Sequence, residues 1–442
     1  MNDTDTMTRQ RPAAAAAPVG LPRLLATGHD VMDLAHHLGI HGPVRYRGPL
    51  SQLIEEIRAA GLTGRGGAAF PTAVKMTAVA QARRRARAHP VVVGNGAEGE
   101  PASAKDKHLL FTEPHLVLDG LQLAAEAVGA RQAYLYVHRH DRLHRLLGAA
   151  LAERSAARCD RVAVEQVFAP PRFLAGEESA LASRVNGGLA LPTFKPPRVF
   201  ERGIGGAPTL VQNVETLAHI ALIARHGAAW FRQVGTAAEP GSMLVTCHHA
   251  DGTSEVAEVA VGTPLADVLP LGGPAVQAVL TGGYHGTWIP TARAARLPLS
   301  GAALREAGAT LGAGVLAALP ADRCGLAETA RVVRYLAAES AGQCGPCLAG
   351  LPRIADALTS LSRMNPDPAW LGHLERWTGL VAGRGACHHP DGTVRLVRSA
   401  LSVFAGEIDR HRRGHCTAGW ARAPFLPVPA EAAGTPRRND WR

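Results

Sequence analysis

Two cysteines lie close together near the C-terminal end of the sequence, as Cys344-Gly345-Pro346-Cys347. The chain has seven cysteines, an odd number without a regular disulfide spacing, and its first 20 residues lack the leucine-rich core of a signal peptide. In such a chain this spacing favours a metal or redox role over a structural disulfide. Cys159 and Cys247 lie in apolar or strand-like segments and are predicted to be packed thiols.

A glycine-rich stretch runs from Gly64 to Thr72 with the sequence GRGGAAFPT, and Lys75 follows it. Glycines let the backbone approach a ligand closely, and consecutive amides ahead of a helix form an anion site. Arg65 and Lys75 are expected to add positive charge for a phosphate. A purely structural turn explains the glycines of this stretch equally well.

Three further polar motifs accompany it. Asn95–Pro101 (NGAEGEP) follows an apolar run, which places its side chains at the carboxyl edge of a sheet, where open α/β sheets bind ligands. Gly176–Leu181 (GEESAL) precedes Phe194–Pro197 (FKPP), and Gly206–Thr216 (GAPTLVQNVET) comes last. Taken alone, the paired acids Glu177 and Glu178 are ordinary helix caps that complement the helix dipole.

Short apolar segments that alternate with helical ones position these motifs. Such an alternation predicts a parallel sheet covered by helices. The strands are expected at 90–94, 133–138 and 162–168, and the helices at 50–60, 72–82, 116–128, 143–155 and 213–226.

The pattern changes after residue 240. Short β-type segments are expected at 243–247, 256–261 and 276–280 with a short helix at 265–269, which indicates a small β-grasp-sized module. Helical segments at 327–338, 348–362, 371–381 and 394–410 then predict a small antiparallel bundle. The expected domains are a disordered leader at 1–44, an α/β domain at 45–237, the β-grasp module at 238–322, the bundle at 323–412 and a tail at 413–442.

Composition excludes several classes of protein. The net charge of +10 is the excess of 47 basic over 37 acidic residues; only four of the basic residues are lysines and 43 are arginines, a skew typical of a GC-rich genome. The cluster Arg83, Arg84, Arg85 and Arg87 is interpreted as a solvated or docking surface, because no nucleic-acid-binding signature accompanies it. The longest apolar stretch, 116–128, contains Asp119 and Glu126, so no membrane-spanning helix is expected.

Taken in order, these motifs resemble the NADH-oxidising flavoprotein subunit of respiratory complex I and the related diaphorase subunits of NAD-linked hydrogenases and formate dehydrogenases. The resemblance covers about residues 45–412. It implies an FMN-binding α/β domain with a Rossmann-like parallel sheet, an SLBB-type β-grasp module and a C-terminal four-helix iron–sulfur bundle. In the implied reaction, a nicotinamide cofactor, NAD(H) or NADP(H), passes a hydride to FMN, and single electrons then reach an iron–sulfur cluster.

The resemblance also assigns residues. Those expected to bind FMN or the nucleotide are Gly64, Arg65, Gly66, Gly67, Phe70, Lys75, Asn95, Glu98, Glu100, Gly176, Glu177, Glu178, Lys195, Gln212 and Asn213. The expected cluster ligands are Cys344, Cys347 and Cys387.

The sequence departs from the family within these motifs. Ala97 replaces an aspartate, Phe173 a tyrosine, and Gln212 the first of two asparagines. Ala78 stands where a nucleotide-stacking aromatic is expected, and Arg198 lies near the position of another, which suggests that NADPH is used as well as or better than NADH.

The cluster motif lacks one cysteine, because Ala341 stands at its position. A four-iron cluster normally has four thiolates, so a three-iron cluster, or a four-iron cluster with a labile corner, is expected. Ser340, His388, His389, water or nothing would complete it. Cys324 and Cys416 are expected about 20–30 Å away, because helices separate them from the motif.

Two functions remain open at this point. The first is an FMN-dependent NAD(P)H dehydrogenase subunit, cytoplasmic or peripheral on the membrane through its partners, that reduces a ferredoxin-like, thioredoxin-like or quinone-linked partner. The basic surface would suit an acidic partner of this kind. The second is a degenerate, non-catalytic homologue that serves as a scaffold in a redox complex, an interpretation that Ala78, Ala97 and Ala341 favour.

Overall fold

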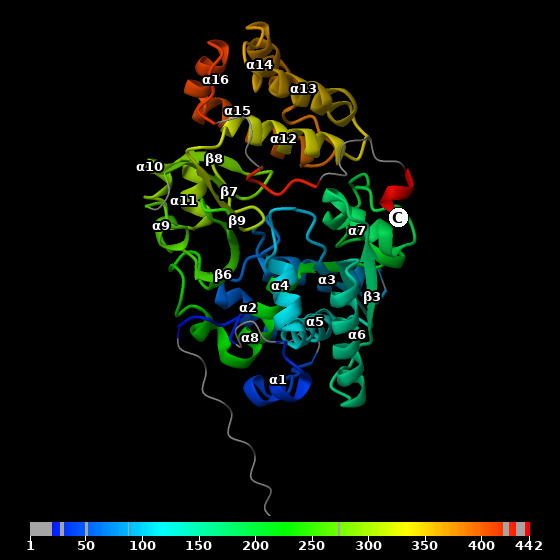
Figure 1. Ribbon diagram of the computed structural model, residues 1–442. Helices are drawn as coiled ribbons and strands as arrows, with labels where there is room; N and C mark the ends of the chain where they lie inside the picture. Colours follow the sequence, from blue (N-terminus) through cyan, green and yellow to red (C-terminus); the bar gives the residue numbers. More distant parts are fainter. Residues whose placement is uncertain are drawn as a thin grey trace, which may run out of the picture.

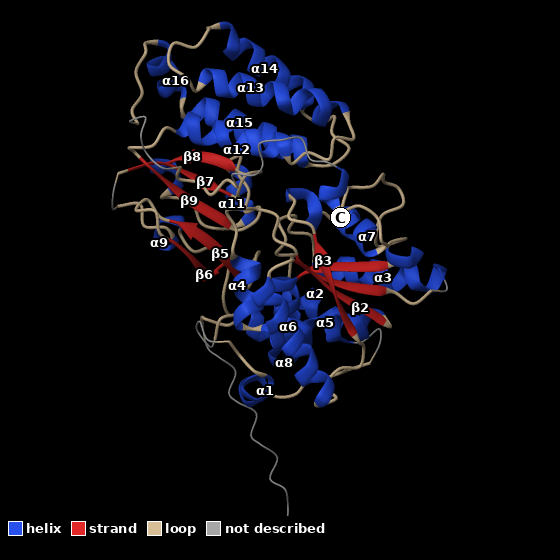
Figure 2. Ribbon diagram, turned by 45° about the vertical axis from the view of Figure 1, so that its right-hand side comes forward, coloured by secondary structure: helices blue, strands red, loops and turns tan. Residues whose placement is uncertain are grey.

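The computed structural model describes residues 20–26, 31–48, 52–86, 88–272, 275–418, 424–429 and 438–442. An α/β region, a second sheet and a helical region follow one another along the chain, and the helical region lies at one end of the molecule (Figure 1). Figure 2 shows the two sheets as separate groups of strands, with the helices α12–α16 above them.

The first sheet has four parallel strands in the order β3-β2-β1-β4. They are β1 (Val91–Gly96), β2 (Gln132–His138), β3 (Val164–Ala169) and β4 (Thr209–Asn213). The chain leaves β1 on one side to form β2 and β3, and then returns to pair β4 with the other side of β1. This reversal creates a topological switch point between β1 and β4, which is the place where open α/β sheets bind ligands.

Helices cover this sheet. They are α2 (Gln52–Ala60), α3 (Thr72–Ala86), α4 (Lys105–Thr112), α5 (Pro114–Val128), α6 (Asp141–Ala156), α7 (Glu178–Val185) and α8 (Val214–Phe231). Helix α5 is almost entirely buried and packs along α8, which bends at Gly227. The predicted parallel α/β sheet is therefore confirmed.

The second sheet has five strands in the order β6-β5-β9-β7-β8. They are β5 (Ser242–His248), β6 (Ser254–Ala260), β7 (Val276–Thr281), β8 (Thr287–Pro290) and β9 (Val315–Pro320). Only β5 and β9 run parallel to each other; the remaining pairs are antiparallel. The short helices of this region are α9 (Leu265–Val268), α10 (Thr291–Ala294) and α11 (Gly301–Glu306).

The helical region contains α12 (Gly325–Ala338), α13 (Leu351–Leu361), α14 (Ala369–Val381), α15 (His389–Val403) and α16 (Ala405–Arg412). A single π-helical turn, Pro346–Gly350, leads into α13. The prediction of one helix over 394–410 is wrong, because the chain bends at Phe404. The Phe404 ring lies so close to Gly325 that a Cβ there would approach the ring carbons to 2.2 Å.

The prediction of a disordered leader over residues 1–44 is wrong for its second half. Helix α1 (Leu34–His41) begins at Asp33, whose side chain accepts a hydrogen bond from the His36 amide. His37 of this helix is fully buried against Asp119 of α5. Residues 1–19 and 27–30 of the expected leader lie outside the described residues.

The last described residues return to the α/β region. The carbonyl of Trp441 accepts a hydrogen bond from the Ala190 amide, and Arg172 pairs with Asp440. Within the described ranges, no helix has both the length and the apolar character needed to cross a membrane.

Candidate functional site

The candidate site is centred on the carboxyl ends of β1 and β4. Asn95 and Asn213 are in register on these neighbouring strands, and the Asn213 Nδ2 donates to the Asn95 carbonyl at 3.4 Å. The same Nδ2 donates to the Asp106 carboxylate at 2.6 Å. The motifs predicted that both asparagines belong to one site, but because β4 was not predicted as a strand, their register on neighbouring strands was not foreseen.

The glycine-rich loop lies against this edge of the sheet. A Cβ on Gly66 would stand 3.3 Å from the Asn213 Cβ, so only a small residue fits there. Gly67 has a φ of +99°, and its Cβ would stand 3.3 Å from the Gly312 carbonyl of the second sheet region. The amide of Gly64 closes the loop on the Phe70 carbonyl at 2.9 Å. The loop leads into α3, so its amides and the start of this helix together form an anion cradle.

A third segment closes the site from the α7 side. The Asn95 Nδ2 donates to the Gly176 carbonyl at 2.9 Å, and a Cβ on Gly176 would stand 2.7 Å from the Ala97 carbonyl. Lys75 pairs with Glu178 at 2.7 Å, and both side chains are partly exposed. The predicted residues of three separate motifs therefore meet here.

Glu177 links this segment to the FKPP motif. Its carboxylate accepts from the amides of Ser179 and Ala180 at the start of α7 and pairs with Lys195 at 2.8 Å. Burial alone would raise the pKa of Glu177, but the hydrogen bonds from Lys195 and Ser179 outweigh it and hold the pKa below its usual value. Phe70 stands 52% exposed, as a nucleotide-stacking ring would.

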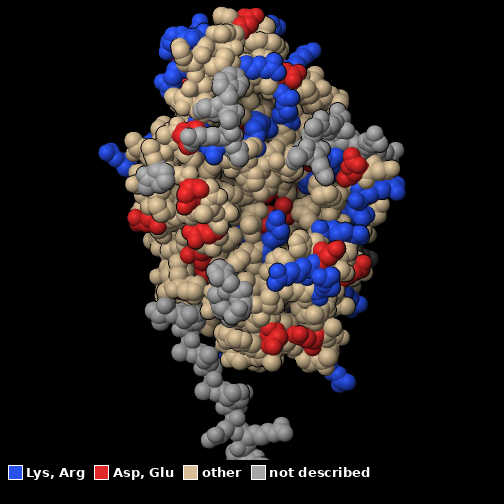
Figure 3. Space-filling view, viewed as in Figure 1, with Lys and Arg blue, Asp and Glu red and all other residues tan. Residues whose placement is uncertain are grey.

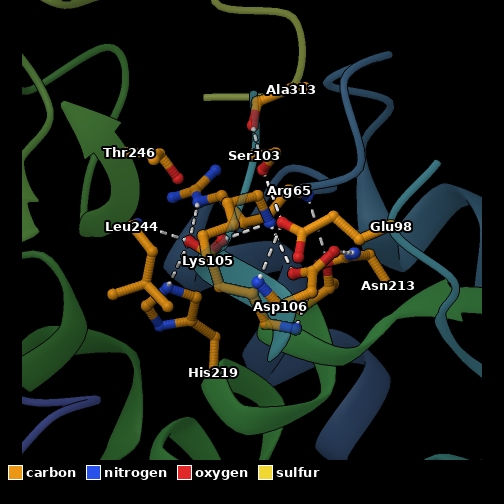
Figure 4. Close-up of polar contacts among 12 residues, drawn as sticks. Arg65, Glu98, Ser103, Lys105, Asp106, Asn213, His219, Leu244, Thr246 and Ala313 are labelled. Carbon is orange, nitrogen blue, oxygen red and sulfur yellow. Dashed lines mark hydrogen bonds and ion pairs between the residues drawn. The ribbon is translucent and has the colours of Figure 1, made fainter. Parts of the chain in front are cut away.

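Two of the predicted ligand side chains are already engaged inside the protein (Figure 4). The Arg65 guanidinium donates to the Ser242 carbonyl at 3.0 Å and lies 3.8 Å from Glu215. Glu98 accepts hydrogen bonds at both carboxylate oxygens, from donors that belong to the start of α4. Arg65 was predicted to add positive charge for a phosphate. In the structure its guanidinium is instead bound inside the protein, by the Ser242 carbonyl and beside Glu215.

Arg65 belongs to a buried polar network that joins the two sheets. Lys105 pairs with Asp106 at 2.7 Å and with Glu215 at 2.8 Å, and Glu215 also accepts from the Leu244 amide of β5 (Figure 4). Glu215 was not among the predicted site residues, although a single carboxylate in the otherwise mostly apolar start of α8 indicates a buried polar contact. A cavity of about 60 Å³ behind the loop adjoins this network. It is far smaller than the ~300–1,000 Å³ of typical ligand sites, so this cavity by itself does not enclose a cofactor.

Glu100 also faces inward. It accepts hydrogen bonds from the Tyr284 amide at 2.9 Å and the Ala102 amide at 3.4 Å, and burial raises its pKa to about 8. The carboxyl group therefore holds its proton at neutral pH while it joins the Asn95–Pro101 loop to the second sheet region.

We expect the substitution Glu100→Gln to flatten the pH dependence of stability. Between the ordinary pKa of 4.5 and the folded value of about 8, the folded state holds one more proton than the unfolded state. The free energy of unfolding therefore falls as pH rises through this window, by up to about 1.4 kcal/mol per unit. Urea unfolding at pH 5 and pH 8 measures the loss, which should be smaller in the variant; an equal loss in both proteins contradicts the assignment.

The three predicted cluster ligands also converge. The Cys344 sulfur accepts hydrogen bonds from the amides of Ala386 and Cys347 and contacts the Cys347 thiol. Cys387 lies close enough to Cys344 for the two to interact. Hydrogen bonds to the sulfur ligands are one of the features that set the reduction potential of an iron–sulfur cluster. The three thiols therefore fit a cluster held by three thiolates.

The cluster residues lie next to the flavin-side loops. Burial raises the pKa of the Cys387 thiol, Glu177 raises it further, and Lys195 opposes the change. These interactions place Cys387 near the pair that closes the α7 side of the site. The Phe173 ring, in the turn that ends at Gly176, lies 5.6 Å from the ring of His389, two residues after Cys387, so the two segments are in contact.

The candidates for a fourth ligand differ in their surroundings. His389 is buried with both ring nitrogens engaged, Nε2 by the Leu336 carbonyl at 2.8 Å and Nδ1 by His285 at 3.0 Å. His388 is exposed and Ser340 is half-buried. Among the described residues, no fourth cysteine joins the three, because Cys324 and Cys416 lie beside each other at another site.

The residues at the β1–β4 edge fit a flavin mononucleotide. The Nε2 of Gln212 is buried and has no hydrogen-bond partner among the described residues, so it is a donor available to a ligand. The cradle at Gly66 keeps the backbone accessible, and Lys75 supplies a partly exposed cation near it.

Comparisons with known families agree with this geometry. The family described as the Nuo51 FMN-binding domain matches residues 57–222. The family described as the NADH-ubiquinone oxidoreductase-F iron-sulfur binding region matches residues 327–411.

Curated relatives extend over most of the chain. The NADH-quinone oxidoreductase F subunit 2 of Rhizobium meliloti is 28% identical over 376 residues, which cover 81% of this chain and 88% of the relative. The NADH-quinone oxidoreductase F subunit of Streptomyces coelicolor is 28% identical over 395 residues, which cover 86% of each chain.

Among solved structures, an NAD+-reducing NiFe hydrogenase in its H2-reduced state aligns with a TM-score of 0.73 and 29% identity over 82% of this chain. This chain spans only 62% of the length of that hydrogenase chain.

Proposed function

We propose that this chain, which carries both the FMN-binding domain and the iron–sulfur binding region of the NADH-quinone oxidoreductase F subunits, oxidises a nicotinamide cofactor and delivers its electrons singly to a partner. The observation that carries this function is the packing of the Phe173 ring, in the turn that ends at Gly176, against the ring of His389, two residues after Cys387, at 5.6 Å between centroids. It brings the iron–sulfur loop against the flavin-side loops of the α/β region, which a short electron path requires.

The protein's own residues have separable tasks in this reaction. The amides of Gly66 and Gly67 and the Lys75 side chain would hold the phosphate, because the Gly64 amide donates to the Phe70 carbonyl and the Arg65 amide to Thr216. Asn95, Gln212 and Asn213 would bind the rest of the FMN. When bound, FMN supplies the step from two-electron to one-electron chemistry. At Gly66 a larger side chain would meet Asn213, and Glu177 pairs with Lys195 beside the start of α7.

The finer domain assignment belongs to the same proposal. The α/β region at 45–237 is the FMN domain, the second sheet at 238–322 is an SLBB-type β-grasp module, and 323–412 is a four-helix iron–sulfur bundle followed by a tail at 413–442. The mixed five-stranded sheet with its short helices supports the β-grasp assignment. Helix α16 would then be a continuation of the fourth bundle helix beyond Phe404.

The nucleotide would lie over the exposed Phe70 ring. Preference for NADPH stays a prediction that rests on Arg198, an exposed residue whose backbone amide donates to Glu201. Its guanidinium would meet a 2′-phosphate or stack on adenine.

The electron acceptor in this proposal is a separate iron–sulfur protein, ferredoxin-like or thioredoxin-like, which would act in the cytoplasm or link the chain to a quinone-reducing assembly. Basic side chains gather along the side of the α/β region that carries α7 (Figure 3). An acidic partner fits such a surface, since opposite charges speed up encounter.

A non-catalytic scaffold is the second candidate, and Ala341 favours it. With three converging thiols instead of four, the cluster is more easily lost. The two candidates differ in flavin binding: the purified chain should bind FMN at micromolar concentrations and oxidise NADH or NADPH with a dye acceptor. Failure to bind FMN supports the scaffold.

We expect Gln212→Met to weaken FMN binding about 10- to 100-fold, because it removes a buried donor without changing the side-chain volume much. The stability of the flavin-free protein should stay equal or rise, since the lost amide nitrogen has no partner in the described part of the chain. Fluorescence titration with FMN and thermal unfolding of the flavin-free form measure the two effects.

Gln277→Met is the matched control. Its Nε2 donates to the carbonyls of Pro320 and Arg323 in the second sheet region. This variant should lose stability and keep its FMN affinity, which is the opposite pattern. Unchanged FMN affinity in Gln212→Met would place the flavin elsewhere.

A further inference from the structure

Four potential metal ligands meet at a second place in the helical region, away from the three cluster cysteines. They are Cys324, Glu407, His411 and Cys416, and one ligand atom from each lies within 4.8 Å of all the others. Cys324, Glu407 and His411 are buried, and Cys416 is half-buried. The proposed electron-transfer function uses none of these residues.

The chain brings the four together through local features of two helices. Cys324 occupies the N-cap position of α12. Glu407 and His411 are one turn apart on α16, so they share a face of that helix. Gly414 then adopts a φ of +77°, which ends the helix and returns the chain so that Cys416 reaches the same point.

The distances match the edges of a tetrahedron around one metal ion. The Cys324 Sγ lies 3.5 Å from the His411 Nε2, and this Nε2 lies 3.2 Å from the Glu407 Oε1. Tetrahedral zinc, with bonds of about 2.3 Å to sulfur and 2.0–2.1 Å to nitrogen and oxygen, gives about 3.6 Å and 3.3 Å for these two edges.

The surrounding groups orient each ligand. The His411 Nδ1 faces the Leu361 carbonyl at 3.4 Å, which leaves Nε2 directed at the other three residues. The Cys324 sulfur accepts from the Ala327 amide and the Cys416 sulfur from the Ala418 amide, each at 3.4 Å. Glu407 is held by Arg410 and by Thr417. Such outer contacts are typical of histidine, thiolate and carboxylate ligands of a metal.

We propose that Cys324, Glu407, His411 and Cys416 bind one zinc ion that fastens the end of α16 to the start of α12. Two thiolates, an imidazole and a carboxylate in a closed tetrahedron form a structural zinc site, without an open position for a substrate. The 14 residues of α12, about 21 Å at 1.5 Å per residue, separate it from the loop that carries Cys344. A cavity of about 180 Å³, lined by Cys324, His411 and Cys416, lies beside the site and gives the ion a path of entry.

The test compares metal content in the full-length protein and two single variants. After purification with added zinc and removal of free metal, elemental analysis should find one zinc per chain in the parent protein. Cys416→Ser should lose this zinc and keep its iron, and Cys344→Ser should show the reverse pattern. Cobalt in place of zinc should give the strong visible absorption of a tetrahedral thiolate site, and this absorption should be absent from Cys416→Ser.

The second measurement is the melting temperature with and without a zinc chelator. It tests the proposal in the parent protein even if a variant folds poorly. A zinc chelator should lower the melting temperature of the parent protein, and His411→Ala should start from the lowered value and respond no further. Three results overturn the proposal: no zinc in the parent protein, iron at this site instead of zinc, or a Cys324–Cys416 disulfide found by mass spectrometry of the alkylated, unreduced chain.

Discussion

Replacing Cys347 by serine should remove the iron–sulfur cluster and stop electron delivery to a protein acceptor, while FMN binding and dye reduction continue. Cys347 is buried and contacts Cys344. It is one of the three cysteines proposed to bind the cluster. Changes in outer-shell residues alone cost about 10–100-fold in metal affinity, and loss of one of three direct ligands should cost more. Iron content, flavin content and rates with the two kinds of acceptor measure the separate effects.

Cys159→Ser is the control for this experiment. Cys159 lies between α6 and β3, in the α/β region, with its thiol facing the Ala157 carbonyl at 4.0 Å. Its replacement should leave iron content and both rates unchanged. If Cys347→Ser keeps its iron, the three cysteines do not form the cluster site.

Replacing Gly120 by alanine should cause the largest loss of stability in the α/β region. Gly120 lies in the middle of α5, where a Cβ would stand 1.8 Å from the Leu217 carbonyl oxygen of α8. Overpacking of a core usually costs about 1–3 kcal/mol, because side chains can shift. Here the obstacle is the backbone of a buried helix, so we expect about 3 kcal/mol or more. Flavin binding should fall as well, since α8 begins directly after Asn213.

Gly148→Ala provides the matched control within a helix of the same region. A Cβ on Gly148 of α6 would meet only the Gln166 side chain, at 3.8 Å. Alanine should therefore stabilise the protein by up to about 1 kcal/mol through its better helix propensity. Urea unfolding followed by far-ultraviolet circular dichroism measures both variants; a Gly120→Ala variant as stable as the parent contradicts the close packing of α5 and α8.

Apolar patterning predicted those elements whose apolar residues follow the pattern of a buried strand or of one packed helix face. Strands β1 and β2 and helices α2, α5 and α6 were found because a strand with both faces covered is continuously apolar, and a packed helix repeats its apolar residues every turn. Strand β4 was missed because its five residues end in Gln212-Asn213 and merge with the motif before α8. Strands β8 and β9 are also short, and a run of four to six apolar residues does not distinguish a strand from a helix.

The orientation of side chains in the site was less predictable than their presence. Motifs indicated that Lys75, Asn95 and Asn213 belong to one site, and the structure brings their segments together. The direction of Arg65 depends on the Ser242 carbonyl, 177 residues further along the chain. No local pattern reports such a partner. The sequence alone shows that Ala341 replaces a cysteine. It does not show that both ring nitrogens of His389 are hydrogen-bonded, because their partners are His285 and the Leu336 carbonyl.

The position of β1 between β2 and β4 also sets an order for biosynthesis. When β2 and β3 have left the ribosome, one edge of β1 still lacks its partner, and β4 emerges more than 100 residues after Gly96. At about 5–20 residues per second, this interval lasts roughly 5–25 s, during which an apolar strand edge is open to mispairing with other chains. Since Asn213 ends β4, the flavin cannot enter a complete site before that edge closes. Cofactor insertion is therefore expected to follow translation of the α/β region, and nascent chains truncated before β4 should be the aggregation-prone species.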